Sequence, residues 1–212
     1  MTPQKATRYP ICDIFSSLQG EGTWSGRPMA FVRAWGCPLT CTWCDEPLHR
    51  DPKSLKHMGA EKIFAQIKKL RPGHKNLLLT GGEPLALAHL EQLVDFFKQA
   101  GWWVAMETSG IGGVLPQNLD WITLSPKKNH SPPEEIYQAA HEIKYVVGAT
   151  PSKKILREIH QRQESHANVW LQPRAKGNKI DPTAVARCVG MVMKSGGRLR
   201  LSMQMHKWIG MP

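Results

Sequence analysis

The chain has 212 residues, of which 41% are hydrophobic, and this length and composition suit a single folded domain with a sizeable core. No apolar run approaches the roughly 20 residues that a membrane-spanning helix needs, and the N-terminus lacks a signal-peptide core, so we expect a cytoplasmic protein without membrane contact. The net charge of +11 invites a nucleic-acid hypothesis, but Lys and Arg are spread along the whole chain, so we expect no nucleic-acid partner.

The N-terminal region is predicted to be extended and rich in turns. Residues 1–8 are polar and without periodicity, and we expect them to be flexible. Residues 9–15 form an extended segment, and the glycine-rich stretch 18–28 that follows is a loop or hairpin. Residues 30–34 are a short apolar strand that carries one charge, Arg33.

Three cysteines follow this strand within eight residues. Cys37, Cys41 and Cys44 are spaced Cys-x3-Cys-x2-Cys, so their thiols can bind one small inorganic group. Disulfides are disfavoured, because the chain has five cysteines and no secretory segment. A closed zinc site needs four ligands, and a zinc site that takes its fourth ligand from elsewhere is the alternative. An iron-sulfur cluster with one open iron fits three local thiolates better.

Strands and helices alternate along the rest of the chain. Residues 46–59 are irregular, because Pro47 and Pro52 prevent a long helix. We predict helices at 60–70, 87–100, 152–163 and 182–193, and strands at 76–79, 102–106, 121–124, 142–147, 169–172 and 198–202. Residues 110–116 are hostile to a helix, so one crossover lacks most of its helix.

This order predicts an α/β fold with about six parallel strands and reduced helix content, an incomplete (β/α)6-type relative of the eight-stranded TIM barrel. Residues 9–29 would be an N-terminal extension of one domain, and residues 30–212 the partial barrel with a C-terminal tail. Parallel barrels carry their active sites at the C-terminal ends of the strands. Five residues follow strands in this way and would share one mouth: Cys37, Thr80, Glu107, Ser125 and Gln172. Cys12 and Cys188 lie outside the cysteine motif and are expected to be buried apolar residues.

Several turns share a pattern with a known family. They are the Cys-x3-Cys-x2-Cys loop with Trp43 before the third cysteine, Gln19-Gly20-Glu21-Gly22, Gly81-Gly82-Glu83-Pro84, Ser125-Pro126-Lys127 and the terminal His206-Lys207. In this order, over about residues 9–212, the chain resembles the 7-carboxy-7-deazaguanine synthase family of the radical S-adenosylmethionine (SAM) enzymes.

The resemblance implies a radical SAM partial TIM barrel and a specific reaction. The family converts 6-carboxy-5,6,7,8-tetrahydropterin to 7-carboxy-7-deazaguanine and ammonia, with SAM used catalytically, on the route to queuosine and other deazapurines. It implies a 4Fe-4S cluster on Cys37, Cys41 and Cys44, together with SAM and Mg²⁺ as cofactors. It also implies a homodimer and an electron donor of the flavodoxin or ferredoxin type.

The resemblance also assigns site residues. The residues that would contact SAM are Gly81, Gly82, Glu83, Ser109, Ser125, Pro126, Lys127 and Gln172. Those that would contact the substrate are Leu18, Gln19, Gly20, Glu21, Arg33, Thr80, His206 and the C-terminal Pro212. The chemistry is suitable, since Gln19 both donates and accepts, Glu21 accepts from ring N–H groups, and Arg33 can pair with a carboxylate.

One position departs from the family pattern. The family follows its Cys-Asp pair with Thr or Ser, whose hydroxyl ligates Mg²⁺, whereas this chain has Glu46. A carboxylate is a good ligand for a hard cation, so Glu46 would bind Mg²⁺ directly, or it is a solvated loop residue that leaves the ion to Asp45.

Two other functions stay open at this point. A glycyl-radical-enzyme activating enzyme shares the cysteine spacing and the Gly-Gly-Glu-Pro turn, although it has no evident use for the set Gln19, Glu21 and Arg33. A zinc-dependent RNA-binding module is the non-enzymatic alternative, motivated by the net charge and the thiols.

Overall fold

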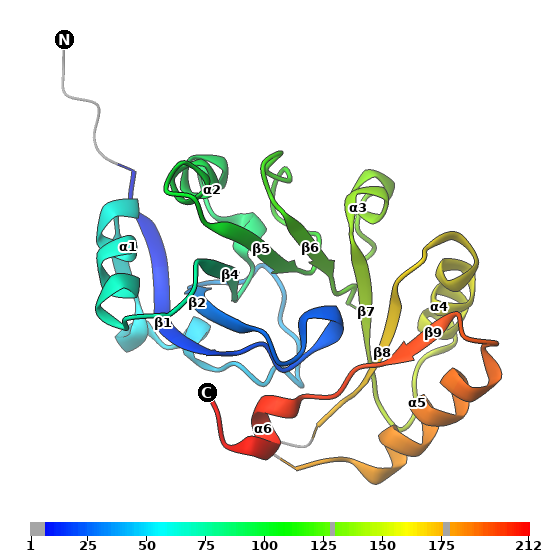
Figure 1. Ribbon diagram of the computed structural model, residues 1–212. Helices are drawn as coiled ribbons and strands as arrows, with labels where there is room; N and C mark the ends of the chain where they lie inside the picture. Colours follow the sequence, from blue (N-terminus) through cyan, green and yellow to red (C-terminus); the bar gives the residue numbers. More distant parts are fainter. Residues whose placement is uncertain (1–6, 128–129, 176–178) are drawn as a thin grey trace. The chain divides into compact units, whose positions relative to one another are not determined.

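The structure, a computed structural model, describes residues 7–127, 130–175 and 179–212 (Figure 1). The chain divides into two compact units. Unit 1 comprises Met1–Ser17 and Pro28–Trp121, and unit 2 comprises Leu18–Arg27 and Ile122–Pro212. The N-terminal residues 1–8 were predicted to be flexible, and most of them, residues 1–6, lie outside the described residues.

Unit 1 is built on a sheet whose central strands are parallel. Its strands lie in the order β3 (Lys56–Met58), β1 (Tyr9–Leu18), β2 (Pro28–Ala34), β4 (Asn76–Gly81) and β5 (Trp103–Thr108). β2, β4 and β5 run parallel, and β3 pairs antiparallel with β1. Arg33 of β2 lies in register with Thr80 of β4, so two predicted substrate ligands sit on adjacent strands.

Two amphipathic helices complete unit 1. They are α1 (Ala60–Lys69) and α2 (Leu90–Gln99), which bury Ile63, Ile67, Leu93 and Phe97. Phe97 also packs edge-on against Trp102, with ring centroids 5.8 Å apart. Shorter 3-10 helices connect the strands: η2 (Leu48–Arg50), η3 (Pro52–Ser54) and η4 (Pro84–Ala86).

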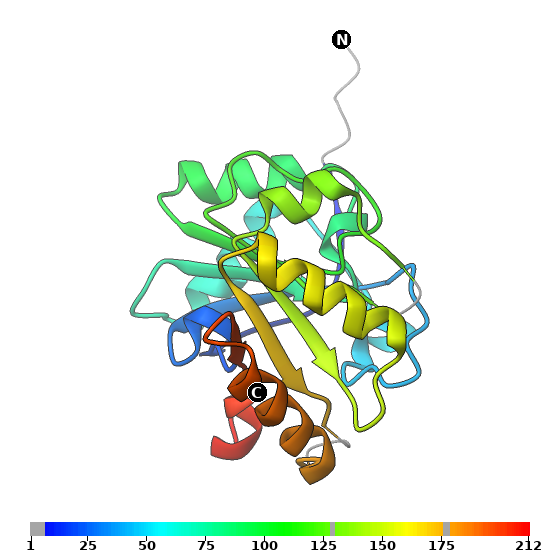
Figure 2. The ribbon, with the colours of Figure 1, turned by 90° about the vertical axis from the view of Figure 1, so that its right-hand side faces the viewer.

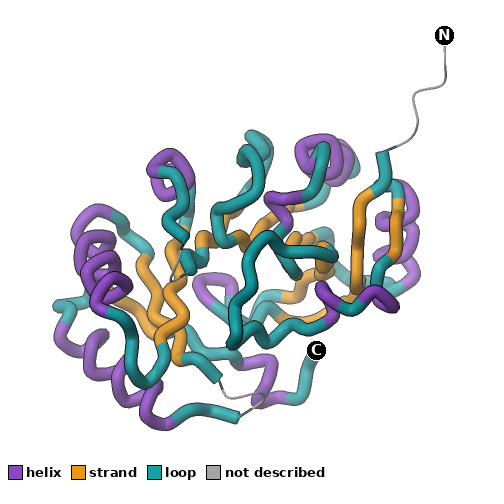
Figure 3. Tube along the Cα trace, turned by 180° about the vertical axis from the view of Figure 1, so that it is seen from behind, coloured by secondary structure: helices purple, strands orange, loops and turns teal. Residues whose placement is uncertain are grey.

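Unit 2 contains four parallel strands. β6 (Trp121–Leu124), β7 (Glu142–Val147), β8 (Val169–Pro173) and β9 (Leu199–Leu201) lie side by side in chain order. Helices α4 (Lys153–Ser165) and α5 (Pro182–Lys194) pack along this sheet (Figure 2). Figure 3 shows both helices on the same side of the strands. Shorter helices are η1 (Gly22–Trp24), α3 (Glu134–Ala139) and α6 (Met205–Ile209).

Local chemistry fixes where the two long helices of unit 2 begin. The side chain of Ser152 accepts a hydrogen bond from the N–H of Ile155 at the start of α4. Asp181 accepts from the N–H groups of Thr183 and Ala184, and Pro182 occupies the first helical position of α5. Both patterns are favourable helix starts, which is why their positions could be predicted from the sequence.

The predicted strands are confirmed, and the differences concern short elements. The helix predicted at 87–100 begins at Leu90, because Pro84–Ala86 form a 3-10 helix and His89 adopts a left-handed conformation with φ 57°. Three short elements were not predicted, because they have too few residues to show a periodicity: β3 with three residues, α3 with six and α6 with five. Cys12 and Cys188 are buried, as predicted. No described helix is long and apolar enough to cross a membrane.

Candidate active site

The cysteine loop of unit 1 is anchored at its first residue. The N–H of Gly36 donates to the carbonyl of His49 at 2.9 Å, and the carbonyl of Gly36 accepts from the N–H of Glu83 at 2.9 Å. Gly36 has φ 91°, a conformation that favours glycine. The loop therefore starts between the 3-10 helix η2 and the Gly-Gly-Glu-Pro turn.

No disulfide joins the three cysteines of the loop, and the other two thiols influence that of Cys37. Burial raises the pKa of the Cys37 thiol, although an N–H donated by Leu39 at 3.4 Å opposes this, and the carboxylate of Glu83 and the other two thiols raise it further. Iron would compensate the charge of the thiolates, so this donor set fits a thiolate-bound cluster. Among the described residues, no group of three His, Cys, Asp or Glu side chains is arranged as a metal ion would require.

His49 is a neighbour of the cysteines that sequence reasoning missed, because a lone histidine in a proline-containing stretch carries no motif. Its side chain is buried, and its Nε2 lies 3.4 Å from the Sγ of Cys44. Burial lowers the pKa of this imidazole, which favours the neutral ring. η2 thus contacts both ends of the cysteine loop, through the His49 carbonyl at Gly36 and the ring at Cys44.

The predicted Mg²⁺ ligand and a predicted substrate ligand form an ion pair. Nη1 of Arg33 lies 2.8 Å from Oε2 of Glu46. The other oxygen of Glu46 accepts from the N–H of Leu48 at 3.0 Å, so each oxygen already has one donor. Asp45, the other predicted ligand, is exposed.

The Gly-Gly-Glu-Pro turn leaves β4 and is closely packed. A Cβ on Gly82 would lie 1.9 Å from the carbonyl oxygen of Gly36, so only glycine fits there. The carboxylate of Glu83, 1% exposed, accepts from the N–H groups of Leu85 at 3.0 Å and Ser109 at 2.7 Å. The hydroxyls of Thr108 and Ser109 also donate to it. Glu83 therefore joins the ends of β4 and β5. Thr108, which lies in the segment Glu107-Thr108-Ser109-Gly110, had been given no role from the sequence.

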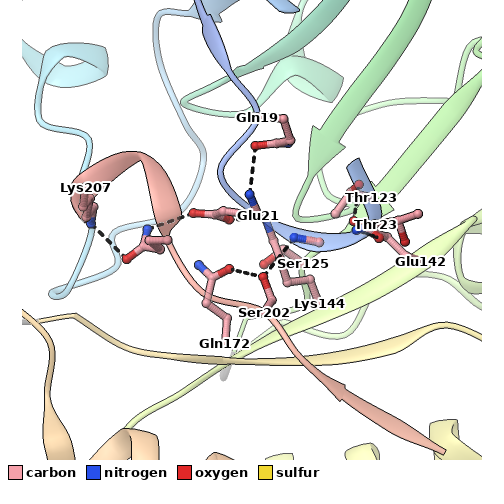
Figure 4. A network of polar contacts seen from close by, with 12 residues as sticks. Gln19, Glu21, Thr23, Thr123, Ser125, Glu142, Lys144, Gln172, Ser202 and Lys207 are labelled. Carbon is pink, nitrogen blue, oxygen red and sulfur yellow. Dashed lines mark hydrogen bonds and ion pairs between the residues drawn. The ribbon is translucent and has the colours of Figure 1, made fainter. Parts of the chain in front are cut away.

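The predicted SAM ligands of unit 2 follow β6 and end β8. Nζ of Lys127 donates to Oγ of Ser125 at 2.6 Å, and Pro126 lies between these two residues. Oε1 of Gln172 accepts from Oγ of Ser202 at 3.0 Å, and that hydroxyl in turn accepts from the N–H of Gly22 at 2.9 Å. This chain of contacts ties the loop 18–27 to the ends of β8 and β9 (Figure 4).

Glu21 is held in this loop by groups distant in sequence. Nζ of Lys144, on β7, forms an ion pair with Oε2 of Glu21, and Nε2 of Gln204 donates to Oε1 at 2.8 Å (Figure 4). Burial, the largest single influence, would raise the pKa of Glu21, but Lys144, Gln204 and His206 together outweigh it and lower the pKa below its ordinary value. Glu21 is thus a largely buried carboxylate that stays ionised. Sequence reasoning named Glu21 and His206. It gave Gln204, which lies in the terminal motif with His206, no role, and it missed Lys144, which belongs to no motif.

The other residues of unit 2 that are predicted to bind substrate include Gln19, Gly20 and His206, which make contacts around the loop 18–27. The N–H of Glu21 donates to Oε1 of Gln19 at 3.3 Å. The carbonyl of Gly20 accepts from the N–H of Met205 at 3.0 Å, and a Cβ on Gly20 would lie 2.0 Å from Nδ1 of His206. Leu18 is half-buried, and Pro212 ends the chain at the surface. The loop and the start of α6 are therefore in direct contact.

Parallel strands that end in a three-cysteine loop and a Gly-Gly-Glu-Pro turn define a radical SAM protein. The sequence profile of the Radical SAM superfamily matches residues 34–128. The crystal structure of QueE from Escherichia coli superposes with a TM-score of 0.76 at 27% identity, covering 94% of this chain and 95% of that chain. SuiB from Streptococcus suis, at 12% identity and a TM-score of 0.54 over 81% of this chain and 47% of that chain, shares the fold alone.

The curated relatives give the family. The 7-carboxy-7-deazaguanine synthase of Haemophilus influenzae is 31% identical over 207 residues, covering 95% of this chain and 93% of the relative. That of Escherichia coli is 29% identical over 226 residues, covering 95% of this chain and 98% of the relative. This chain belongs to the 7-carboxy-7-deazaguanine synthase family. The family and the α/β partial barrel predicted from the motifs are thereby confirmed, and the superfamily implies a 4Fe-4S cluster and SAM.

Proposed function

We propose that this protein converts 6-carboxy-5,6,7,8-tetrahydropterin to 7-carboxy-7-deazaguanine with loss of ammonia, as a radical SAM carbon-nitrogen lyase of queuosine biosynthesis. The observation that carries the proposal is similarity over nearly the whole chain, 31% identity across 95% of its residues, to a synthase of that name. At 95% of the chain, the match extends far beyond the superfamily region 34–128.

The protein's own part in this reaction is to hold and orient the reactants. The cluster and SAM, when bound, supply the radical chemistry. Cys37, Cys41 and Cys44 would hold the cluster. The backbone of the turn at Gly81 and Gly82 would approach the SAM amino group closely, and the other SAM contacts would be those predicted from the sequence: Glu83, Ser109, Ser125, Pro126, Lys127 and Gln172.

The substrate residues suit the edges of a carboxylated pterin. Glu21, kept ionised by Lys144, can accept N–H groups of the ring and its exocyclic amine. Gln19 can both donate and accept. Arg33 can pair with the substrate carboxylate, and this carboxylate would then replace Glu46 as the partner of Arg33. Leu18, Gly20, Thr80, His206 and the C-terminal carboxylate of Pro212 complete the proposed contacts.

We also propose Mg²⁺ as a cofactor, and its binding by Glu46 would require a change in the contacts that Glu46 makes. Each oxygen of Glu46 already accepts from one donor, Arg33 or the N–H of Leu48, and a Mg²⁺ ion bound by Glu46 would weaken its pairing with Arg33 by charge repulsion. The substrate carboxylate could then take its place on Arg33. We propose three further properties from the family: a flavodoxin or ferredoxin as electron donor, a homodimer, and a cytoplasmic location.

Anaerobic turnover tests the proposed function. The protein, reconstituted with iron and sulfide, is incubated with SAM, a chemical reductant, Mg²⁺ and 6-carboxytetrahydropterin, and the products are separated by chromatography and mass spectrometry. We expect 7-carboxy-7-deazaguanine and ammonia in equal amounts, with SAM not consumed in stoichiometric quantity. Reductive cleavage of SAM without a deazaguanine product would overturn the proposal in favour of another radical SAM reaction.

A further inference from the structure

We propose that Lys144 is a positioning residue for the substrate, which acts by keeping Glu21 ionised and oriented. The proposal rests on the proposed function, in which Glu21 accepts N–H groups of the pterin. Nothing in the sequence motifs points to Lys144, and 123 residues separate it from Glu21. Its assignment comes from the contacts that β7 and the C-terminal segment make with the loop 18–27.

The first observation is the burial of the ion pair. The side chain of Lys144 is 3% exposed and that of Glu21 is 12% exposed. A buried ammonium group without a partner is costly, and so is a buried carboxylate, so each charge depends on the other. Lys144 sits within the regular strand β7, whose backbone is fixed by its parallel pairing with β8, so its ammonium group is a rigid anchor for Oε2 of Glu21.

The second observation is that the other oxygen of Glu21 is also held. Nε2 of Gln204 donates to Oε1 at 2.8 Å, and Nζ of Lys207 donates to Oε1 of Gln204 at 3.0 Å (Figure 4). The carboxylate is therefore fixed from two sides, by β7 and by the segment that leads into α6. Its oxygens together offer about four acceptor positions, so a carboxylate held in this way can still accept from a ligand.

The charge state decides whether such acceptance is possible. A protonated Glu21 would present an O–H and lose part of its capacity to accept N–H groups, whereas the carboxylate accepts only. Within the part of the chain that the structure describes, the charged or titratable groups that act on Glu21 are Lys144 of β7, His206 of α6 and, through Gln204, Lys207. Of these, Lys144 contributes most strongly to holding the negative charge, and Lys144→Met would leave burial to favour the protonated form.

Substrate binding without turnover tests the inference. The cluster-loaded protein is titrated anaerobically with 6-carboxytetrahydropterin in the absence of SAM and reductant, and the dissociation constant is measured by calorimetry from pH 6 to 9. For Lys144→Met we expect binding weakened about tenfold or more at pH 7, as for loss of a charge-assisted hydrogen bond. The difference in affinity between Lys144→Met and the wild type should diminish as pH rises, because Glu21 of the variant then loses its proton. Any pH dependence that comes from ionisation of the substrate itself appears in the wild-type curve as well, so that curve is the reference.

Matched variants isolate the charge at this position. Lys144→Arg keeps the positive charge and should restore most of the affinity. Lys154→Met removes an exposed lysine from α4 and should bind like the wild type at every pH. A constant loss of affinity across the pH range in Lys144→Met, or a failure of Lys144→Arg to recover, would overturn the inference. If Lys144→Met does not fold, Lys144→Gln serves the same comparison with the same expected pH dependence.

Glu21→Gln separates this inference from the proposed function. If Lys144 acts through Glu21, the double variant Glu21→Gln/Lys144→Met should bind no more weakly than Glu21→Gln alone. Wild-type binding by Glu21→Gln would refute the substrate role of Glu21 itself. Weak binding by Glu21→Gln together with normal binding by Lys144→Met would refute the role of Lys144 and leave the proposed function intact.

Discussion

At the scale of single residues, Glu83 combines a motif position with a structural task. Its buried carboxylate accepts from two backbone N–H groups, of Leu85 and Ser109, and from the hydroxyls of Thr108 and Ser109. These donors come from two strand ends, so the turn and the end of β5 are held together by one side chain. Glu83 is therefore both a residue of the Gly-Gly-Glu-Pro motif and a residue that stabilises the fold.

We expect Glu83→Gln to lower the free energy of unfolding by about 1.5–3 kcal/mol, because an amide replaces a charged acceptor and turns an NH₂ group toward bound donors. Urea denaturation followed by circular dichroism measures the change. Glu91→Gln, at an exposed position in the first turn of α2, is the control and should change stability by less than about 0.5 kcal/mol. Equal stability of the two variants would contradict this account of Glu83.

Glu46 also acts at the residue scale, because it occupies the guanidinium of Arg33. We expect Glu46→Gln to lower the KM for 6-carboxytetrahydropterin in the absence of Mg²⁺, since the substrate carboxylate no longer competes with a charged side chain. The stimulation by Mg²⁺ should also decrease if Glu46 is a ligand of the ion. Steady-state kinetics with and without Mg²⁺ measure both effects, and a higher KM without Mg²⁺ would contradict the competition.

At the scale of elements, the helices of unit 2 begin where a side chain satisfies their first N–H groups. Asp181 accepts from Thr183 and Ala184 at 3.1 and 3.4 Å and thereby fixes the start of α5. α5 packs against β8 and β9, whose ends carry Gln172 and Ser202. If the start of α5 became less ordered, the positions of Gln172 and Ser202 would therefore be less well fixed, because β8 and β9 pack against this helix.

We expect Asp181→Ala to destabilise the protein by about 1 kcal/mol, the usual cost of losing an N-terminal cap. Thermal and urea unfolding give the value. Lys179→Ala, two residues earlier at an exposed position, should leave the stability within about 0.5 kcal/mol of the wild type. A larger loss in Lys179→Ala than in Asp181→Ala would show that the cap is not the source of the effect.

The same scale shows which elements a sequence can predict. α1, α4 and α5 have ten or more residues and start or repeat in recognisable ways, so their positions follow from periodicity and capping. α6 has five residues, and its position depends on the hydrogen bond from Met205 to Gly20. A helix of little more than one turn gains its stability from such contacts, because its own hydrogen bonds are few.

At the scale of the whole molecule, the charge of +11 and the three thiols are the basis of the alternative of a zinc-dependent RNA-binding module. The metal content of the purified protein tests this alternative. We expect anaerobically purified protein to contain iron and acid-labile sulfide with no stoichiometric zinc, because three local thiolates suit a cluster with an open iron. Elemental analysis and visible absorption measure this. One zinc per chain without iron would contradict the cluster, and His49 beside Cys44 would then be the natural fourth ligand.

The sequence alone predicted three cluster ligands and determined the Gly-Gly-Glu-Pro turn and the order of the main strands, because these depend on neighbours within a few residues. It also named Glu21 and His206 as site residues. Only the tertiary structure decided what holds Glu21, since Lys144 and Gln204 lie 123 and 183 residues from it. It likewise brought Arg33 to Glu46 and His49 to Cys44. Contacts of this kind leave no local pattern, because they form only when strand ends and chain ends meet in the folded protein.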